Sequence, residues 1–124
     1  MTFKKGVPNM IVIENHIGSI RVTKTYLYSL IEHTVTNCFG VADLNDSSPI
    51  ETLKTKLFPS DIRRGIRLRT RQNQLVVDLH IVTGLGANMT AITDSIRNKV
   101  RYAIEQATGF QPAAINVYID GIRA

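Results

Sequence analysis

The clearest pattern in the chain is an alternation of apolar and polar residues, which is typical of β-strands with one buried face. It covers residues 66–71, 75–83 and 114–120, and shorter strands are predicted at 10–13, 19–22 and 41–44. In the central stretch, Val77, Leu79 and Ile81 share the face expected to be buried. The opposite face is predicted to carry Arg21, Arg67, Arg69, Arg71, Val76, Asp78, His80, Val82, Asn116 and Tyr118. That face is basic and only partly apolar.

Two longer stretches repeat their apolar residues every three or four positions, as a helix does when it buries one side. The first follows Thr23 or Thr25, either of which can cap it. The second follows Asn88 or Thr90 and ends before Gly109, a residue type that is common just beyond helix C-termini. Both helices are expected to pack their apolar stripe on the sheet.

Two shorter signals complete the prediction. Residues 48–57 start with a capping box and a proline at the first helical position, which predicts a short third helix. Residues 72–74 form a polar turn between two alternating stretches, which predicts a β-hairpin. Since the buried side chains of both strands must share a face, the hairpin loop has an even number of residues. The two possible loops, Gln72-Asn73 and Asn73-Gln74, place Asp78 opposite Arg67 or Arg69.

Together, these elements predict an α+β fold. Because each long helix has one apolar stripe and each strand one apolar face, we expect a two-layer sandwich. It consists of a mixed β-sheet with two main helices packed on one face and a short extra helix at its edge. The chain has no evident linker or internal repeat, which indicates a single domain over residues 1–124, with a loose start and an ordered core at about 10–123.

Composition limits the cellular compartment of the protein and the classes of partner that it can bind. The formal net charge is +5, which is compatible with nucleic acid, an anionic membrane surface or an acidic protein as a partner. The single cysteine excludes an internal disulfide, and no apolar run is long enough to span a membrane. We therefore expect a cytoplasmic protein without direct membrane insertion.

No group of residues has the spacing of a catalytic or ligand site. Gly84-Leu85-Gly86 lacks the further residues of nucleotide-binding loops and is interpreted as a tight connection. Cys38 lies on an apolar stripe at a helix C-terminus, where burial and the helix dipole both disfavour a thiolate. The three histidines lie on different predicted elements, without a companion at metal-ligand spacing. We expect no enzyme activity, no metal and no cofactor.

The strongest local feature is the run of five arginines between Arg63 and Arg71. With Tyr118 on the same predicted face, it is similar to surfaces that bind single-stranded nucleic acid by charge and stacking. No Phe or Trp is interleaved with these arginines, so a solvated or protein-binding face is the preferred interpretation. The alternative is a nucleic-acid-binding module that uses the basic sheet face.

Several short motifs follow one another in a defined order. They are Gly18-Ser19-Ile20-Arg21-Val22, Phe39-Gly40-Val41, Arg64-Gly65-Ile66, Val77-Asp78-Leu79-His80-Ile81-Val82, Gly86, Asn98-Lys99-Val100, Thr108-Gly109 and Ile115-Asn116-Val117-Tyr118-Ile119-Asp120-Gly121-Ile122. This series resembles the alkaline-shock protein family of Gram-positive bacteria, whose members are also called envelope stress response or general stress proteins. The resemblance covers about residues 10–123.

The resemblance implies a small cytoplasmic domain without catalytic residues, which associates with itself. In some members of that family, an anchored relative bearing the same domain holds the protein at the membrane. The present chain resembles the short form. On this basis we predict a structural or adaptor protein of the envelope stress response. It would form homo-oligomers, bind a membrane-anchored or same-fold partner, and associate with the membrane only through that partner.

The partner-binding residues are predicted on the exposed sheet face, because apolar side chains among charged ones mark interaction surfaces. They are Arg67, Arg69, Arg71, Val76, His80, Val82 and Tyr118. Charge reversal of Arg69 and Arg71 is expected to abolish partner binding and to leave thermal stability nearly unchanged.

Overall fold

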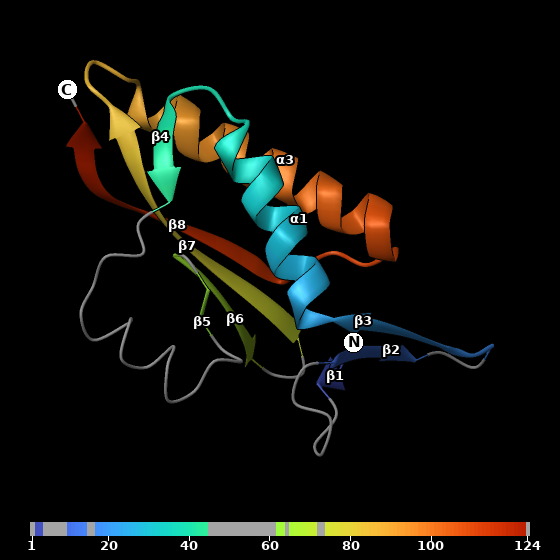
Figure 1. Cartoon of the computed structure of the whole chain (residues 1–124). Coiled ribbons are helices and arrows are strands. Elements are labelled where there is room, and N and C mark those ends of the chain that lie inside the picture. The colour runs from blue at the N-terminus through green and yellow to red at the C-terminus, as the bar shows by residue number, and fades with distance from the viewer. Residues whose placement is uncertain are drawn as a thin grey trace.

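The chain adopts an α+β fold, as its hydrophobic patterns predict (Figure 1). The computed structural model describes residues 2–3, 10–14, 17–44, 62–63, 65–71 and 74–123. Its strands are β1 (Thr2–Phe3), β2 (Met10–Glu14), β3 (Ser19–Thr23), β4 (Val41–Leu44), β5 (Ile62–Arg63), β6 (Ile66–Arg71), β7 (Gln74–Gly84) and β8 (Ala114–Arg123), and its helices are α1 (Lys24–Thr36) and α3 (Met89–Thr108). The predicted short helix over residues 48–57 lies outside the described residues.

The longest strand, β7, is the centre of a mixed sheet. Along one edge it pairs in parallel with β8, from Val76 to Gly84. The other edge is shared by two antiparallel strands, since β6 pairs with residues 74–79 and β4 with residues 81–83. The short strand β5 continues the sheet beyond β6. Because β7 has partners on both edges, it is the strand around which this sheet is organised.

The first three strands form a separate antiparallel sheet with the order β1-β2-β3. The prediction of a single sheet is therefore wrong, and Arg21 on β3 does not share a face with the arginines of β6. The prediction of a loose start is also wrong for Thr2–Phe3, which pairs with β2. Two residues are too short a stretch for an alternating pattern to be recognised.

The buried residues of both helices and of one sheet face form a single core. Figure 1 shows α1 and α3 on the same side of the sheet formed by β6, β7 and β8. The core residues include Leu27, Ile31 and Val35 of α1, Ile92, Ile96, Val100 and Ile104 of α3, and Ile66, Leu68, Val77, Leu79, Ile81 and Ile115 of the sheet. The helical spacing in the sequence thus predicted the buried stripes, and each fully buried Leu or Ile contributes about 1.5–3 kcal/mol.

The helix ends follow the capping rules. Thr23 Oγ1 accepts a hydrogen bond from the Tyr26 amide over 3.1 Å, so Thr23 is the N-cap of α1. Asn88 Oδ1 accepts from the Ala91 amide over 3.0 Å and caps α3. Gly109 ends α3 with a left-handed φ of 82°, which a residue without a Cβ adopts at little cost. In each case the earlier of the two predicted caps is the one used.

Candidate functional site

The candidate site lies on the side of the five-stranded sheet that faces away from the helices. Alternate residues of β6, β7 and β8 point to this side because strand side chains alternate between faces. We call it the outer face, and it comprises Arg67, Arg69, Arg71, Val76, Asp78, His80, Val82, Asn116, Tyr118 and Asp120. It contains every residue that the sequence predicts to bind a partner.

The β6–β7 hairpin decides which side chains meet on the outer face. Arg71 pairs with Gln74, which is the first of the two predicted registers. Arg67 is therefore directly opposite Asp78. A one-residue slip would turn every side chain of the strand to the other face.

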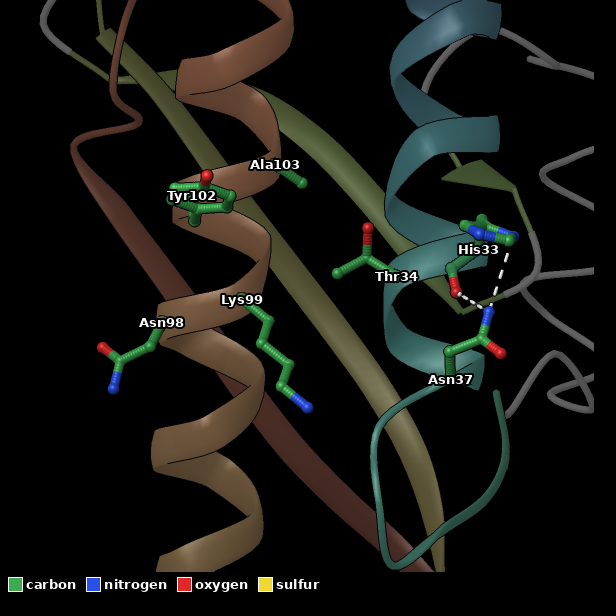
Figure 2. Close-up of a pocket in the computed structure, with 7 residues that line it drawn as sticks. All are labelled: His33, Thr34, Asn37, Asn98, Lys99, Tyr102 and Ala103. Atoms are coloured by element: carbon green, nitrogen blue, oxygen red, sulfur yellow. Dashed lines mark hydrogen bonds between the residues drawn. The ribbon is translucent and has the colours of Figure 1, made fainter.

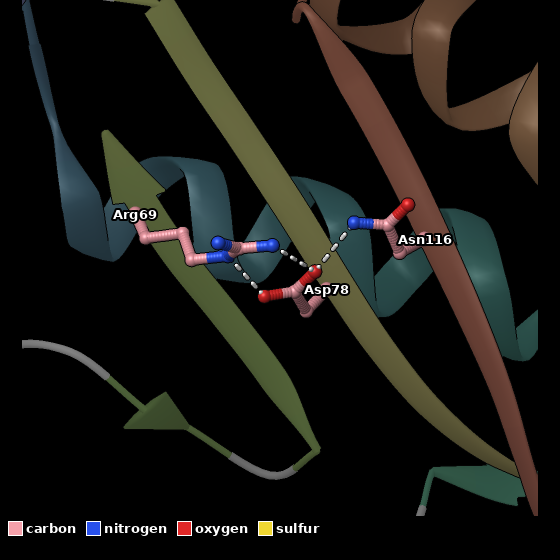
Figure 3. A network of polar contacts seen from close by, with 3 residues as sticks. All are labelled: Arg69, Asp78 and Asn116. Carbon is pink, nitrogen blue, oxygen red and sulfur yellow. Dashed lines mark hydrogen bonds and ion pairs between the residues drawn. The ribbon is translucent and has the colours of Figure 1, made fainter. Parts of the chain in front are cut away.

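Asp78 is held by side chains from both neighbouring strands (Figure 3). Arg69 Nε donates to Asp78 Oδ2 over 2.6 Å, and Arg69 Nη2 donates to Oδ1 over 3.4 Å. Asn116 Nδ2 donates to Asp78 Oδ1 over 2.9 Å. The ion pair therefore uses the diagonal arginine of β6, which a long side chain can reach across the strands. The hydrogen bond to Asp78 and the charge of this carboxylate raise the pKa of Arg69 above its ordinary value.

This network stabilises the sheet because it satisfies a carboxylate that is almost completely buried. The side chain of Asp78 is only 8% exposed, whereas that of Arg69 is 40% exposed. A buried charge is costly unless it is paired and hydrogen-bonded, and Asp78 has both kinds of partner. The three strands β6, β7 and β8 are thus joined by side chains as well as by their backbones.

A second group of contacts links β7 to β8. His80 and Tyr118 are direct partners in the parallel register, and their rings stack with centroids 4.8 Å apart and planes 16° apart. His80 Nδ1 lies 2.8 Å from Asp120 Oδ2. Because a carboxylate can only accept, the imidazole donates through Nδ1. The register shifts between the Ile81–Ile119 and Val82–Gly121 pairs, which is the mark of a β-bulge at Asp120, and the Asp120 carboxylate lies next to the His80 ring.

Four residues of the outer face are exposed, namely Arg67, Arg71, Tyr118 and Asp120. Arg67 and Arg71 are exposed and form no ion pair with any residue that the structure describes. Tyr118 is 45% exposed although one face of its ring contacts His80. Val82 and His80 are half-buried. These cationic and aromatic groups lie beside the ordered contacts of Arg69 and His80.

Val76 differs from its prediction, because it was expected to be exposed and is only 2% exposed. Its neighbours in register are Arg69 on β6 and Ala114 on β8. A small side chain beside an arginine is readily covered, since the aliphatic part of arginine packs on apolar surface. Val76 therefore does not offer a contact to a partner.

The sequence predicted Asp78 opposite Arg67 or Arg69, but it did not predict the bond from Asn116 to Asp78 or the contact between Asp120 and His80. To predict these contacts, one would have to know that β8 pairs with β7 and that the two strands run parallel. Strand order depends on contacts between distant segments, which local periodicity does not report. The bulge at Asp120 has one signal in the sequence, Gly121 within the strand, because an isolated glycine in a strand pattern suggests a bulge.

A pocket of about 410 Å³ lies between the two helices, on the other side of the molecule's core (Figure 2). Its lining residues are His33, Thr34 and Asn37 from α1 and its C-cap, and Asn98, Lys99, Tyr102 and Ala103 from α3. Asn37 Nδ2 donates to the His33 carbonyl over 2.6 Å. No carboxylate is among the lining residues that the structure describes.

The other positions that the sequence suggests for chemistry are Cys38 and the Gly84-Leu85-Gly86 connection. Cys38 is buried, its thiol contacts the Thr34 carbonyl over 3.3 Å, and burial raises its pKa, which keeps the sulfur protonated and unreactive. Gly86 has a φ of 80° in the tight connection between β7 and α3. In the described part of the chain, no cluster of three or more His, Cys, Asp or Glu residues could hold a metal, and no helix is long and apolar enough to cross a membrane.

Comparison with known proteins gives one family and two relatives. A family model for alkaline shock protein 23, described by a cell envelope-related function, matches residues 12–124. The uncharacterized protein YloU of Bacillus subtilis strain 168 is 20% identical over 114 residues, which cover 91% of this chain and 95% of that protein. The uncharacterized protein Spy1614 of Streptococcus pyogenes serotype M6 is 21% identical over 107 residues, or 86% and 88% of the two chains. No solved structure matches the chain.

Proposed function

Because the chain belongs to the alkaline shock protein 23 family, which has a cell envelope-related function, we propose that it is a non-enzymatic adaptor of the cell envelope. It associates with itself and binds a membrane-anchored or same-fold partner through the outer face. Its site of action is the cytoplasmic side of the membrane, where the partner retains it. The envelope stress response is the setting in which we expect this adaptor to act.

The observation that carries the proposal is that the outer face is ordered by its own contacts. Asp78 fixes Arg69 and Asn116, and the His80 ring fixes Tyr118. Binding costs less conformational entropy when the contacting side chains are already held in place. Tyrosine and arginine are also the residue types that dominate binding energies at protein interfaces. An ordered surface of this kind is suited to a protein partner.

The charges of the outer face indicate which charge the partner surface must carry. Arg69 is neutralised by Asp78, whereas Arg67 and Arg71 have no carboxylate partner among the described residues. A partner with carboxylates opposite these two guanidinium groups would form bidentate hydrogen bonds and would associate faster at low salt. We therefore expect an acidic patch on the partner.

The non-enzymatic part of the proposal is supported by the composition of the site. His80 and Asp120 form the one contact on the outer face that could transfer protons, and its imidazole stacks on Tyr118. No serine, threonine or cysteine is among the outer-face residues to act as a nucleophile beside this pair. A proton-transfer pair without a nucleophile beside it is more simply explained as a structural contact.

The test is capture of partners from the membrane fraction of the native host with a tagged chain. The variant Arg67→Glu/Arg71→Glu should lose the captured protein, because it reverses the two charges of the outer face that have no carboxylate partner among the described residues. The matched control is Arg21→Glu/Lys99→Glu, which changes the net charge equally at exposed positions on β3 and α3. The control should capture as the wild type does.

Two outcomes would contradict the proposal. Equal loss in both variants would show that the total charge matters and the outer face does not. Recovery of RNA in place of protein, with an affinity that falls steeply with salt, would assign the arginines to nucleic-acid binding.

A further inference from the structure

The outer edge of β8 has no strand beside it in the described part of the chain. β8 is ten residues long and pairs with β7 alone among the described strands. The opposite edge of such a strand presents backbone N–H and C=O groups that can pair with another chain. Proteins commonly protect these edges with proline, lysine, a short strand or a bulge, and in β8 only the register shift at Asp120 is of this kind, so the run Ala114–Ile119 is unprotected.

The apolar layer under β8 is also incomplete. Val117 and Ile119 are in register with Leu79 and Ile81 of β7, on the face that contributes to the core. Leu79 and Ile81 are 0% exposed, whereas Val117 and Ile119 are only half-buried. The core is therefore closed at β7 and partly open to solvent at β8.

We propose that a second copy of this chain pairs with β8, antiparallel, about a twofold axis at Val117. The sheet of one copy then continues into the sheet of the other, and their outer faces form one surface. This inference rests on the self-association in the proposed function and names the surface that performs it. A closed twofold contact of this type buries the same strand of each copy.

The sequence of β8 favours the register centred on Val117. It places Ile115 opposite Ile119 of the second copy on the core side, so that apolar residues meet. Asn116 then lies opposite Tyr118 of the second copy on the outer side, and no two charges oppose one another. Cross-strand pairs of this kind stabilise an antiparallel sheet.

Two other antiparallel registers of β8 also keep the core sides of both copies on the same face of the sheet, but they allow fewer regular strand pairs. The bulge at Asp120 interrupts regular pairing after Ile119. A centre at Tyr118 would include this bulge within two residues of the axis, and a centre at Asn116 would extend toward Pro112, which has no amide hydrogen. The regular run Ala114–Ile119 is used best when the axis lies at Val117.

The test is disulfide crosslinking of single-cysteine variants in a Cys38→Ala background. Val117→Cys should form a covalent dimer under mild oxidation, because directly opposed Cβ atoms lie about 4.5–5.5 Å apart. The control is Ile122→Cys, whose position is 55% exposed and so favours random collisions. In the proposed dimer the two copies of residue 122 lie about 33 Å apart along the strands, so this variant should remain monomeric on a denaturing gel.

Sedimentation of the unoxidised wild type should show a dimer. A monomer at all concentrations, or crosslinking at Ile122→Cys as fast as at Val117→Cys, would overturn the inference. A same-fold relative crosslinked to Val117→Cys in native extract, in place of a second copy, would also contradict it. None of these results depends on Arg67 or Arg71, so capture of a membrane partner through the outer face would still be tested separately.

Discussion

Two arginines on the same face of β6 have different roles at the scale of single residues. Arg67 is in register with Asp78, yet it forms no ion pair with the described residues. Arg69 is in register with Val76 and binds Asp78 diagonally. The expectation that Arg69 can be reversed in charge without loss of stability therefore needs revision, because reversal would leave a buried carboxylate facing another negative charge.

This difference predicts the outcome of three substitutions measured by urea unfolding. Asp78→Ala should lower the free energy of unfolding by about 1–3 kcal/mol, since it removes a buried hydrogen-bonding partner. Arg69→Ala should also destabilise the protein, whereas Arg67→Ala should leave the unfolding midpoint nearly unchanged. Equal effects of the two arginine substitutions would show that the diagonal pairing does not exist in solution.

Gly40 shows how one connection positions two elements. It joins α1 to β4 with a φ of 79°, and an added Cβ would lie 2.5 Å from Cδ1 of Ile92 on α3. Ile92 is 0% exposed, so its side chain could yield to the added Cβ only by shifting within the core. The backbone of this connection therefore packs directly on α3, and only glycine fits both the dihedral angle and the contact.

Gly86 provides a matched control for this contact. It has a nearly equal φ of 80°, but an added Cβ would meet nothing within 4 Å. Gly86→Ala should therefore lower the free energy of unfolding only by the cost of a left-handed backbone at a residue with a Cβ, about 1–2 kcal/mol. Gly40→Ala should lose about 1–3 kcal/mol more because it also overpacks the core at Ile92. Equal losses in urea unfolding would show that the connection and α3 are not in contact.

At the scale of the whole molecule, the two sheets differ in how they are supported. β7 has hydrogen-bonded strands on both edges and its side chains Leu75, Val77, Leu79 and Ile81 are 0% exposed. The sheet formed by β1, β2 and β3 shares the core through Ile11 and Val22 but pairs with none of the strands around β7. The sheet of β1 to β3 can therefore open while β7 remains folded.

Native-state hydrogen exchange should show this difference. The amides of β7 should exchange only on global unfolding, and those of β1 and β2 should exchange at a lower free energy. The measurement is exchange followed in low concentrations of denaturant. If both sheets exchange with the global free energy of unfolding, they form one cooperative unit and this expectation is wrong.

The sequence predicted the longer helices and strands and missed the shortest strands. The pattern predicted α1, α3 and the strands β2, β3, β4, β6, β7 and β8 within a few residues. It also predicted the loop of the β6–β7 hairpin as one of two possibilities, because adjacent strands must align their apolar faces. It missed the strands β1 and β5, which are two residues long.

The sequence by itself determined which segments are helices and strands and which side of each is buried. These properties depend on the direction of neighbouring side chains along one backbone, and therefore on local periodicity. The tertiary structure alone decided that β8 lies parallel to β7, that β4 and β6 share one edge, and that Asp78 binds Arg69 and Asn116. Such contacts join residues far apart in the chain, so the packing of the complete core selects them.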